Sequence, residues 1–274
     1  MNTSSFPLVT EKDLQLPLYL TSIGHWESQE RTRRPAGFPD FQWLQVLSGT
    51  GELRIGDRLF TVKPGQGFFL FPREQHLYNP VTEPWDVHWI AFNGSLITPL
   101  LRQVGISQSG VHQVFAPDNL IMQMKNLYAT SISGHPFLGM ECSKQLYAFL
   151  LDLTRSIWMS ATSSSPDPMK LHPVTQYIEE NCHRPVTIAE LADRIGVSSQ
   201  YLCHLFKITL NMRPMEYVNR ERIHKSKEWM FREPTLKIQE IAARVGFDNP
   251  SYFSSVFRKL EGVSPERFKK SHGM

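Results

Sequence analysis

The sequence contains little cysteine and no long hydrophobic run. Its three cysteines, Cys142, Cys182 and Cys203, lie far apart and form no CxxC pair, so neither a disulfide framework nor a zinc site is expected. No stretch approaches the roughly 18 uncharged apolar residues that a membrane span needs. Residues 1–12 lack the apolar run behind a basic start that marks a secretory signal. We therefore expect a cytoplasmic protein that does not bind membranes.

Charge of one sign is nearly balanced over the chain but not along it. The net charge is +3; residues 170–274 carry 17 Lys and Arg against 12 Asp and Glu, whereas residues 1–169 carry 12 against 14. A C-terminal part with a charge of +5 suits a polyanionic partner. A length of 274 residues allows two domains of ordinary size.

Residues 18–92 have the pattern of an antiparallel β structure. Short runs rich in strand formers alternate with Gly- and Pro-containing turn signals. The runs are 41–47, 51–55, 58–62, 68–71 and 87–92, and the turn signals are 48–51, 56–57 and 64–67. Gly56-Asp57, between two alternating runs, predicts a hairpin. Many short strands at regular spacing predict a sandwich or a barrel.

A barrel of the cupin type can hold a catalytic metal when about three His and a carboxylate converge, usually as His-x-His followed by Glu. Here His76 stands between Gln75 and Leu77, and no His-x-His occurs in the barrel region. We therefore expect no metal, no cofactor and no catalytic residues, and an enzyme is the less favoured class.

Residues 96–160 follow the strands with amphipathic helical spacing, because apolar residues recur at i, i+3 and i+4. Two interpretations fit these helices. They only cap the barrel, or part of their apolar stripe forms the interface of a homodimer. Residues 161–169, rich in Ser and Pro, predict a linker. The expected domains are therefore 1–160 and 170–274.

One short pattern occurs twice in the C-terminal part, at residues 191–207 and 241–258. Each copy reads as a short apolar helix, a Gly and a second apolar helix, which is the pattern of a helix-turn-helix. A long helix is expected over residues 214–231. It would hold the two units about one turn of DNA apart, roughly 34 Å, so that two successive major grooves could be read.

Local signals predict where the helices of the first unit begin and turn. Thr187 and Glu190 form a capping box, in which each side chain accepts a hydrogen bond from the backbone amide of the other. Gly196 permits the tight turn through a positive φ. Ser198 can cap the next helix.

The outward faces of the two second helices are the candidate DNA-reading surface. Apolar residues at i, i+1, i+4 and i+5, beginning at Tyr201 and at Tyr252, are expected to face the core. The remaining positions are Ser199, Gln200, Cys203, His204 and Lys207 in the first helix and Asn249, Pro250, Ser251, Ser254, Ser255 and Arg258 in the second. Gln200 and His204 can reach base edges, whereas Lys207 and Arg258 suit phosphates. The short side chains of the second helix predict mainly backbone and shape contacts.

This C-terminal part resembles the DNA-binding domain of the AraC/XylS family of bacterial transcription regulators. The residues that carry the resemblance are 188–192, 201–207, 222–223, 238–242, 245–247, 252–259, 262–265 and 268. Two departures are visible. Asn211 stands where the family usually has Gly, which is tolerable because Asn accepts a left-handed conformation. Lys237 replaces the usual Ser or Thr cap of the second unit, so that helix is expected to be less well capped.

The N-terminal half resembles the cupin-like effector domain of the same family. The matching segments are 34–37, 64–65, 71–72, 76–78 and 89–92. In the arabinose-responsive members, the corresponding Arg, Tyr and Trp contact the sugar. The resemblance therefore implies Arg34, Tyr78 and Trp89 as ligand-binding residues, to which we add the neighbouring His88. Val87 stands where those members place a ligand-contacting His, so the set of sugar contacts is incomplete.

The resemblance implies an α+β multidomain fold, in which a cupin-like β-barrel with a helical dimerisation segment precedes an all-α domain with two helix-turn-helix units. It also implies a homodimeric transcription regulator that binds promoter DNA and a small molecule, with a sugar as the expected class. An activator is favoured over a repressor, and RNA polymerase would then be a partner. Two alternatives stay open: a ligand-independent regulator whose barrel only dimerises, and a cupin enzyme fused to a DNA-binding module.

Overall fold

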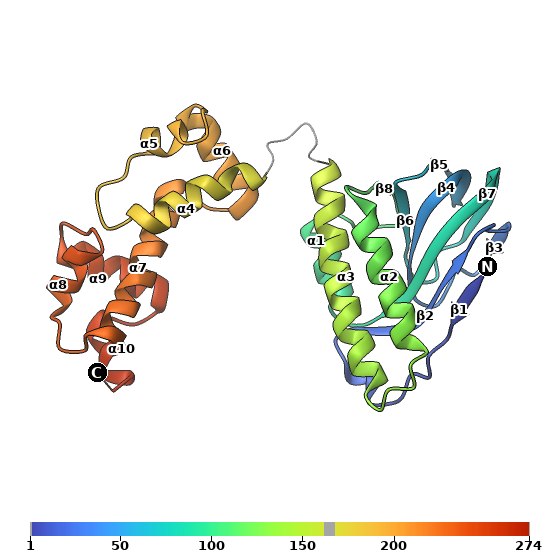
Figure 1. Cartoon of the computed structure of the whole chain (residues 1–274), viewed down its shortest axis with the longest axis horizontal. Helices are drawn as coiled ribbons and strands as arrows, with labels where there is room; N and C mark the ends of the chain where they lie inside the picture. The colour runs from blue at the N-terminus through green and yellow to red at the C-terminus, as the bar shows by residue number, and fades with distance from the viewer. Residues whose placement is uncertain (1, 162–167, 274) are drawn as a thin grey trace. The chain divides into compact units, whose positions relative to one another are not determined.

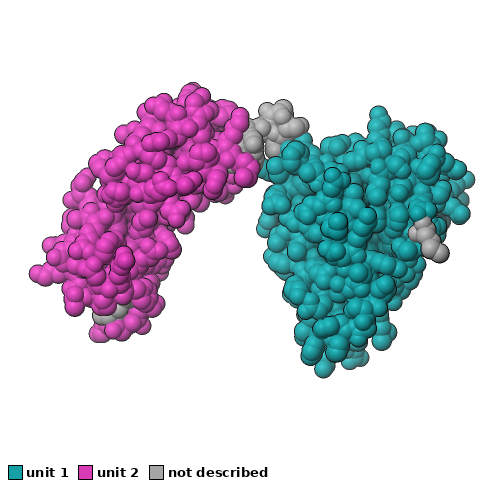
Figure 2. All heavy atoms as spheres, viewed as in Figure 1, with its two compact units in different colours: residues 1–164 teal, residues 165–274 magenta. Residues whose placement is uncertain are grey.

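The computed structural model describes residues 2–161 and 168–273. The chain divides into two compact units, residues 1–164 and 165–274 (Figure 1, Figure 2). Most of the predicted linker, 161–169, lies outside the described residues. The described strands all belong to the first unit, and the described part of the second unit is helical. The predicted fold class, a β-rich domain followed by an all-α domain, is therefore confirmed.

The first unit is built on one antiparallel sheet of eight strands. Their spatial order is β1-β2-β7-β4-β6-β8, while β3 pairs with β7 and β5 pairs with β4. The strands are β1 (Thr3–Ser5), β2 (Tyr19–Trp26), β3 (Thr32–Arg34), β4 (Phe41–Ile55), β5 (Arg58–Val62), β6 (Gln66–Leu70), β7 (His76–Asn93) and β8 (Gly110–Gln113). The long strands β4 and β7 lie side by side, and the other strands are added to this pair.

One predicted turn is wrong, because residues 48–51 lie inside β4 and do not separate two strands. The register between β4 and β7 shifts at several places around this segment, so its glycines mark a bend within one strand. Gly49 has a φ of 74°, and a Cβ atom there would lie 2.3 Å from the carbonyl oxygen of Pro84. The hairpin predicted at Gly56-Asp57 is confirmed by the pairing of β4 with β5.

Alternation along the strands creates two separate cores on the two faces of the sheet. Phe92 and its neighbours on one face pack against α1 (Ile97–Gln103), α2 (Pro117–Ser131) and α3 (Leu138–Ala161). The short helix η1 (Asp13–Gln15) buries no residue. In Figure 1, α2 and α3 lie along one side of the sheet. The other face carries a second core that includes Leu44, Phe68 and Trp85.

The second unit has two helical cores joined by one long helix. Its helices are η2 (Pro168–Leu171), α4 (His172–Asn181), α5 (Ile188–Asp193), α6 (Ser199–Leu210), α7 (Pro214–Arg232), α8 (Ile238–Arg244), α9 (Pro250–Glu261) and α10 (Pro265–Ser271). Val218 of α7 belongs to the core of the first helix-turn-helix, whereas Ile223 and Met230 belong to that of the second. No helix in the described part of the chain is long and apolar enough to cross a bilayer.

The capping box predicted for α5 forms only in part. The Oγ1 atom of Thr187 accepts a hydrogen bond from the amide of Glu190 at 3.2 Å, as expected. The carboxylate of Glu190, however, bonds to Arg184 and to the hydroxyl of Tyr177. These partners compete with the cap amide for the same oxygen atoms, because a charged guanidinium makes the stronger hydrogen bond.

Candidate nucleic-acid interface and ligand pocket

The first helix-turn-helix is formed by α5 and α6. Gly196, in the turn between them, has a φ of 64°, and the Oγ atom of Ser198 accepts a hydrogen bond from the amide of Tyr201 at 3.1 Å. Both features were predicted. The helix ends at Asn211, which adopts the left-handed conformation with a φ of 53°. Because the side chains of Leu202 and its apolar neighbours are fully buried, the opposite face of α6 points to solvent.

The second helix-turn-helix, formed by α8 and α9, repeats this geometry with a different cap. The Oδ1 atom of Asn249 accepts hydrogen bonds from the amides of Ser251 and Tyr252, at 2.8 and 3.0 Å. Phe253 is completely buried. The prediction that Tyr252 faces the core is wrong, since its side chain is 55% exposed. Its hydroxyl instead accepts a hydrogen bond from Asn219 of α7, so the ring lies at the rim of the unit.

The cap of α8 also differs from the expectation for a Lys at that position. Glu240 accepts a hydrogen bond from the amide of Lys237 at 2.7 Å. A Lys side chain has no acceptor atom, so only this half of a capping box can form. The first helix-turn-helix thus has the Thr half of the capping box, and the second has the Glu half.

None of the predicted DNA-reading residues is buried. The exposed members are Ser199, Gln200, His204, Lys207, Asn249, Pro250, Ser251, Ser255 and Arg258, and the half-buried ones are Cys203 and Ser254. Each set lies on its own helix. Beside α9, Ser254, Ser255, Arg258 and Lys259 line a shallow hollow together with Ser264, the cap of α10. Hydroxyl groups and cations combined in this way suit a phosphate backbone.

The two helix-turn-helix units are joined by Arg222 in the middle of α7. Its Nε atom donates to the carbonyl of Cys182 at 2.7 Å, and its terminal nitrogen donates to the carbonyl of Arg184 at 3.0 Å. The guanidinium also lies 5.4 Å from the ring centroid of Phe247, which belongs to the second helix-turn-helix. Gly246 packs against the same loop, since a Cβ atom there would approach the carbonyl of Cys182 to 2.6 Å. No role of this arginine was predicted from the sequence pattern.

A hollow of about 250 Å³ lies in the first unit. It brings together three of the predicted ligand-binding residues, Arg34, Tyr78 and Trp89. They come from strands β3 and β7, which are paired. The other residues that line it are Phe6, Ser22, Trp26, Gln29, Glu30, Arg31, Thr32, Phe38, Gln42 and Leu44. The lining therefore combines aromatic faces with amide, hydroxyl and charged groups, as binding sites for small polar molecules do.

Neighbouring residues hold the three predicted side chains in place. The guanidinium of Arg34 lies 4.2 Å above the ring of Phe38. Burial raises the pKa of the Tyr78 phenol above its ordinary value, an effect that the nearby Arg34 opposes. The indole of Trp89 lies over Gly24 of β2, where a Cβ atom would approach the ring to 2.6 Å. Without a glycine at that position the indole could not lie flat against β2.

Gln42 and Phe6 also line this hollow, although the sequence did not identify them. Gln42 is 3% exposed, and its Oε1 atom has no hydrogen-bond partner among the residues that the structure describes. An unsatisfied buried acceptor at a cavity indicates a place for a ligand donor or a water. A polar residue inside the apolar run 41–47 was a signal for Gln42. Phe6, whose ring lies 6.2 Å from that of Trp89, gave no signal in the sequence.

His88 lies in a different hollow from the other three predicted ligand residues. Successive residues of a strand point to opposite faces, so His88 faces helix α2 while Trp89 faces the ligand hollow. The His88 ring stacks on His25 at 4.1 Å, and His25 is 2.8 Å from Asp86. Burial, with smaller contributions from His25 and Lys125, lowers the pKa of His88 to about 4. Its hollow has a volume of about 240 Å³.

Residues 191–271 match a family model described as a helix-turn-helix domain, and residues 21–150 match one described as an AraC-like ligand binding domain. The matched segments cover both helix-turn-helix units and most of the sheet with its helices. The class of protein is therefore a ligand-responsive transcription regulator that binds DNA.

Three relatives span most of the chain. An uncharacterised helix-turn-helix regulator from Bacillus subtilis, YisR, is 30% identical over 85% of this chain and 86% of its own. The arabinose operon regulatory protein of Salmonella typhimurium is 26% identical over 86% and 85%, respectively. The lactose operon transcription activator of Staphylococcus xylosus is 24% identical over 82% and 81%. The chain belongs to the AraC/XylS family of transcription regulators.

Proposed function

We propose that this chain is a homodimeric, cytoplasmic transcription activator that is controlled by a sugar. The sugar binds between Arg34, Tyr78 and Trp89, and helices α6 and α9 read promoter DNA. The observation that carries the proposal is the hollow where these three residues meet the unpartnered oxygen of Gln42. The relatives named for arabinose and lactose operons support a sugar as the effector class.

The chemistry of the hollow suits a monosaccharide better than an apolar ligand. An indole face packs against the C–H groups of a sugar ring. A guanidinium donates several hydrogen bonds to hydroxyl oxygens, and the free Oε1 atom of Gln42 can accept a hydrogen bond from a hydroxyl group. Glu30 adds a carboxylate that can accept further hydrogen bonds from hydroxyl groups. His88 points to the opposite face of the sheet and is left out of the proposed contacts.

The DNA side of the proposal assigns different tasks to the two reading helices. Gln200 and His204 of α6 are exposed side chains long enough to reach base edges in a major groove. Helix α9 presents serines, with Arg258 at its C-terminal end, and would contribute phosphate and shape contacts. Lys207 would bind a phosphate, although in the free protein it donates a hydrogen bond to Asn211 at 2.8 Å.

Dimerisation is assigned to α3. Met140, Tyr147 and Leu151 recur at intervals of seven and four residues, and their side chains are 59%, 42% and 42% exposed. This spacing forms one stripe along a helix, as in helix-pair interfaces. Replacing Tyr147 and Leu151 with Glu should turn a dimer into a monomer in sedimentation experiments. A wild-type protein that already sediments as a monomer at micromolar concentration would refute this assignment.

The sugar assignment is tested by calorimetry of the full chain with arabinose, lactose, glucose and galactose. We expect one of them to bind, and Trp89→Ala, Gln42→Leu and Arg34→Gln each to weaken its binding at least tenfold. Arg102→Gln, an exposed substitution on α1, is the matched control for Arg34→Gln and should bind normally. Binding that Trp89→Ala leaves unchanged would refute the proposed pocket. Absence of binding across the panel would favour a barrel that only dimerises.

The DNA assignment is tested separately, with fragments of the promoter upstream of this gene. Gln200→Ala and His204→Ala should each cost about 1–3 kcal/mol and relax the preference at one base position. Lys207→Gln should weaken all sequences equally and reduce the slope of affinity against salt by about one. Lys63→Gln removes one charge from the first unit and should change neither quantity. Equal losses for Lys207→Gln and Lys63→Gln would contradict a direct phosphate contact.

A further inference from the structure

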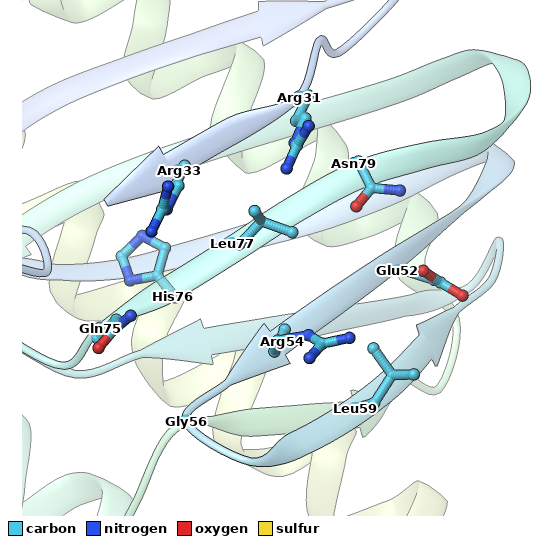
Figure 3. Close-up of a pocket in the computed structure, with 10 residues that line it drawn as sticks. All are labelled: Arg31, Arg33, Glu52, Arg54, Gly56, Leu59, Gln75, His76, Leu77 and Asn79. Atoms are coloured by element: carbon cyan, nitrogen blue, oxygen red, sulfur yellow. The ribbon is translucent and has the colours of Figure 1, made fainter. Parts of the chain in front are cut away.

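A second hollow in the first unit carries three arginines to which the proposed function gives no specific task. It has a volume of about 410 Å³ and is lined by Arg31, Arg33 and Arg54, with the amides of Gln75 and Asn79 beside them (Figure 3). Leu77 lies on its floor between the arginines. In Figure 3 the Arg31 and Arg33 side chains project from one side of this floor and Arg54 projects from the other.

The strand register places these arginines on one face. Arg33 of β3 lies opposite Leu77 of β7, and Leu77 lies opposite Arg54 of β4. Adjacent strands are about 4.8 Å apart, so the Cα atoms of the two arginines are separated by about 10 Å. That separation leaves room for one small group between the two guanidinium ends, which can swing over Leu77.

Nothing in the described part of the chain neutralises these charges. Arg31, Arg33 and Arg54 are all exposed, and within the described residues none of them has a carboxylate within 4.0 Å, whereas the neighbouring Arg58 pairs with Glu74 at 3.3 Å. Glu52 is the one carboxylate among the residues that line the hollow. Three cations and one anion leave a local charge of +2. Like charges that share one face of a sheet repel each other, and a bound anion would relieve this repulsion.

We propose that this hollow binds the phosphate group of a small phosphorylated molecule. Arginine forks match the oxygen geometry of phosphate and bind it through paired hydrogen bonds. Gln75 and Asn79 offer donors and acceptors to hydroxyl groups on the rest of the molecule, and Glu52 can accept a hydrogen bond from one of them. The regulator would then have two ligand sites. One, between Arg34, Tyr78 and Trp89, would bind a neutral sugar, and the other, between Arg33 and Arg54, would bind an anionic phosphate.

A small molecule fits this surface better than a DNA backbone does. Residues 1–169 carry 12 Lys and Arg against 14 Asp and Glu, so the arginines form an isolated positive site on a domain of net negative charge. DNA-binding surfaces instead extend positive charge over a broad face. The site is also a concave hollow of about 410 Å³, a size that suits a small molecule with one phosphate group.

Arg33 and Arg54 are the residues to change, because Arg31 also lines the proposed sugar pocket. The double variant Arg33→Gln/Arg54→Gln removes two charges from the outer hollow and leaves the sugar pocket's lining unchanged. Lys63→Gln/Arg102→Gln is the matched control, since it removes two charges from exposed positions of the same unit. Circular dichroism and thermal melting verify that both variants fold.

Calorimetry of the full chain with inorganic phosphate and glucose 6-phosphate, at constant ionic strength in chloride, tests the proposal. Glucose alone serves as the uncharged comparison. We expect saturable binding of both phosphates to one site per chain. Arg33→Gln/Arg54→Gln should weaken this binding at least tenfold, and the control variant should bind as the wild type does.

Three results would overturn the proposal. The first is the absence of saturable phosphate binding. The second is phosphate binding that is equal in the two double variants, which would place the ion at the DNA-reading helices or at no defined site. The third is a lower salt dependence of promoter binding in Arg33→Gln/Arg54→Gln with phosphate binding unchanged, which would make the hollow a DNA contact.

Discussion

Replacing Arg222 with Ala should uncouple the two helix-turn-helix units while leaving each of them folded. The side chain donates one hydrogen bond to the carbonyl of Cys182 and one to that of Arg184, and its guanidinium lies beside Phe247 of the second helix-turn-helix. It thus connects the loop before α5 to the turn before α9 through the middle of α7. Burial lowers the pKa of Arg222, but the side chain stays charged at neutral pH because a guanidinium is not deprotonated in proteins.

The magnitude follows from the two bonds that are lost. A hydrogen bond from a charged group contributes about 1.5–3 kcal/mol. Water can reach this half-buried site and replace part of each bond, so we expect the free energy of unfolding of the second unit to fall by about 2–4 kcal/mol. Arg222→Lys should recover less than half of this, because an ammonium group cannot donate to both carbonyls in the fork geometry of Arg.

The assay compares a DNA fragment with both half-sites and a fragment with one. Two rigidly joined units bind their half-sites with a high effective concentration, which is lost when the joint loosens. We expect Arg222→Ala to weaken binding to the full site at least tenfold and binding to a single half-site by less than twofold. Arg220→Ala is the matched control, because Arg220 also lies on α7 and makes an exposed pair with Glu216 at 3.2 Å. Equal losses on both fragments would refute the idea of a joint.

Three further predictions concern stability. The pKa of Glu190, lowered to about 2 by Arg184 and then Tyr177, implies stabilisation that is complete above pH 4.5 and is lost as pH falls towards 2; Glu190→Gln should remove this pH dependence, about 1 kcal/mol after solvent screening. His88, with its pKa of about 4, is buried neutral, so stability should fall by about 2 kcal/mol from pH 6.5 to pH 4, and a profile in urea unchanged by His88→Phe would contradict this. Asn211→Ala should lower the free energy of unfolding by about 1 kcal/mol, because Asn211 has a φ of 53°, whereas Asn211→Gly should not. Equal losses of stability for the two variants in thermal melts would contradict this prediction.

The second unit could be predicted from the sequence because its signals are local. A positive φ at Gly196 and a cap at Ser198 each depend on residues within one turn of the chain. The apolar spacing of α6 likewise follows from 3.6 residues per turn. The prediction fails where a distant partner competes: the carboxylate of Glu190 bonds to Arg184, and the ring of Tyr252 is held by Asn219 of α7.

The first unit was harder to predict, because its pairings join residues far apart in the sequence. The run of Gly and Ser at 48–51 looks like a turn but is a bend inside β4, where Gly49 makes room for Pro84. The short strand β8 follows α1 and pairs with β6; its few residues carry no alternation that distinguishes them from a loop. Three of the four predicted ligand residues line one hollow. They could be predicted because the family resemblance supplied them, and not because a local pattern pointed to them.

The alternation of β7 explains how one strand can serve both halves of the first unit. Tyr78 and Trp89 face the proposed sugar pocket, while His88 and Ile90 face helices α2 and α3. A ligand that moves the indole of Trp89 must therefore displace the backbone between two residues that pack against the helices. Packed cores have low compressibility and transmit such strain. Because the proposed dimer stripe lies on the exposed face of α3, the geometry offers a short path by which sugar binding could alter how two copies associate.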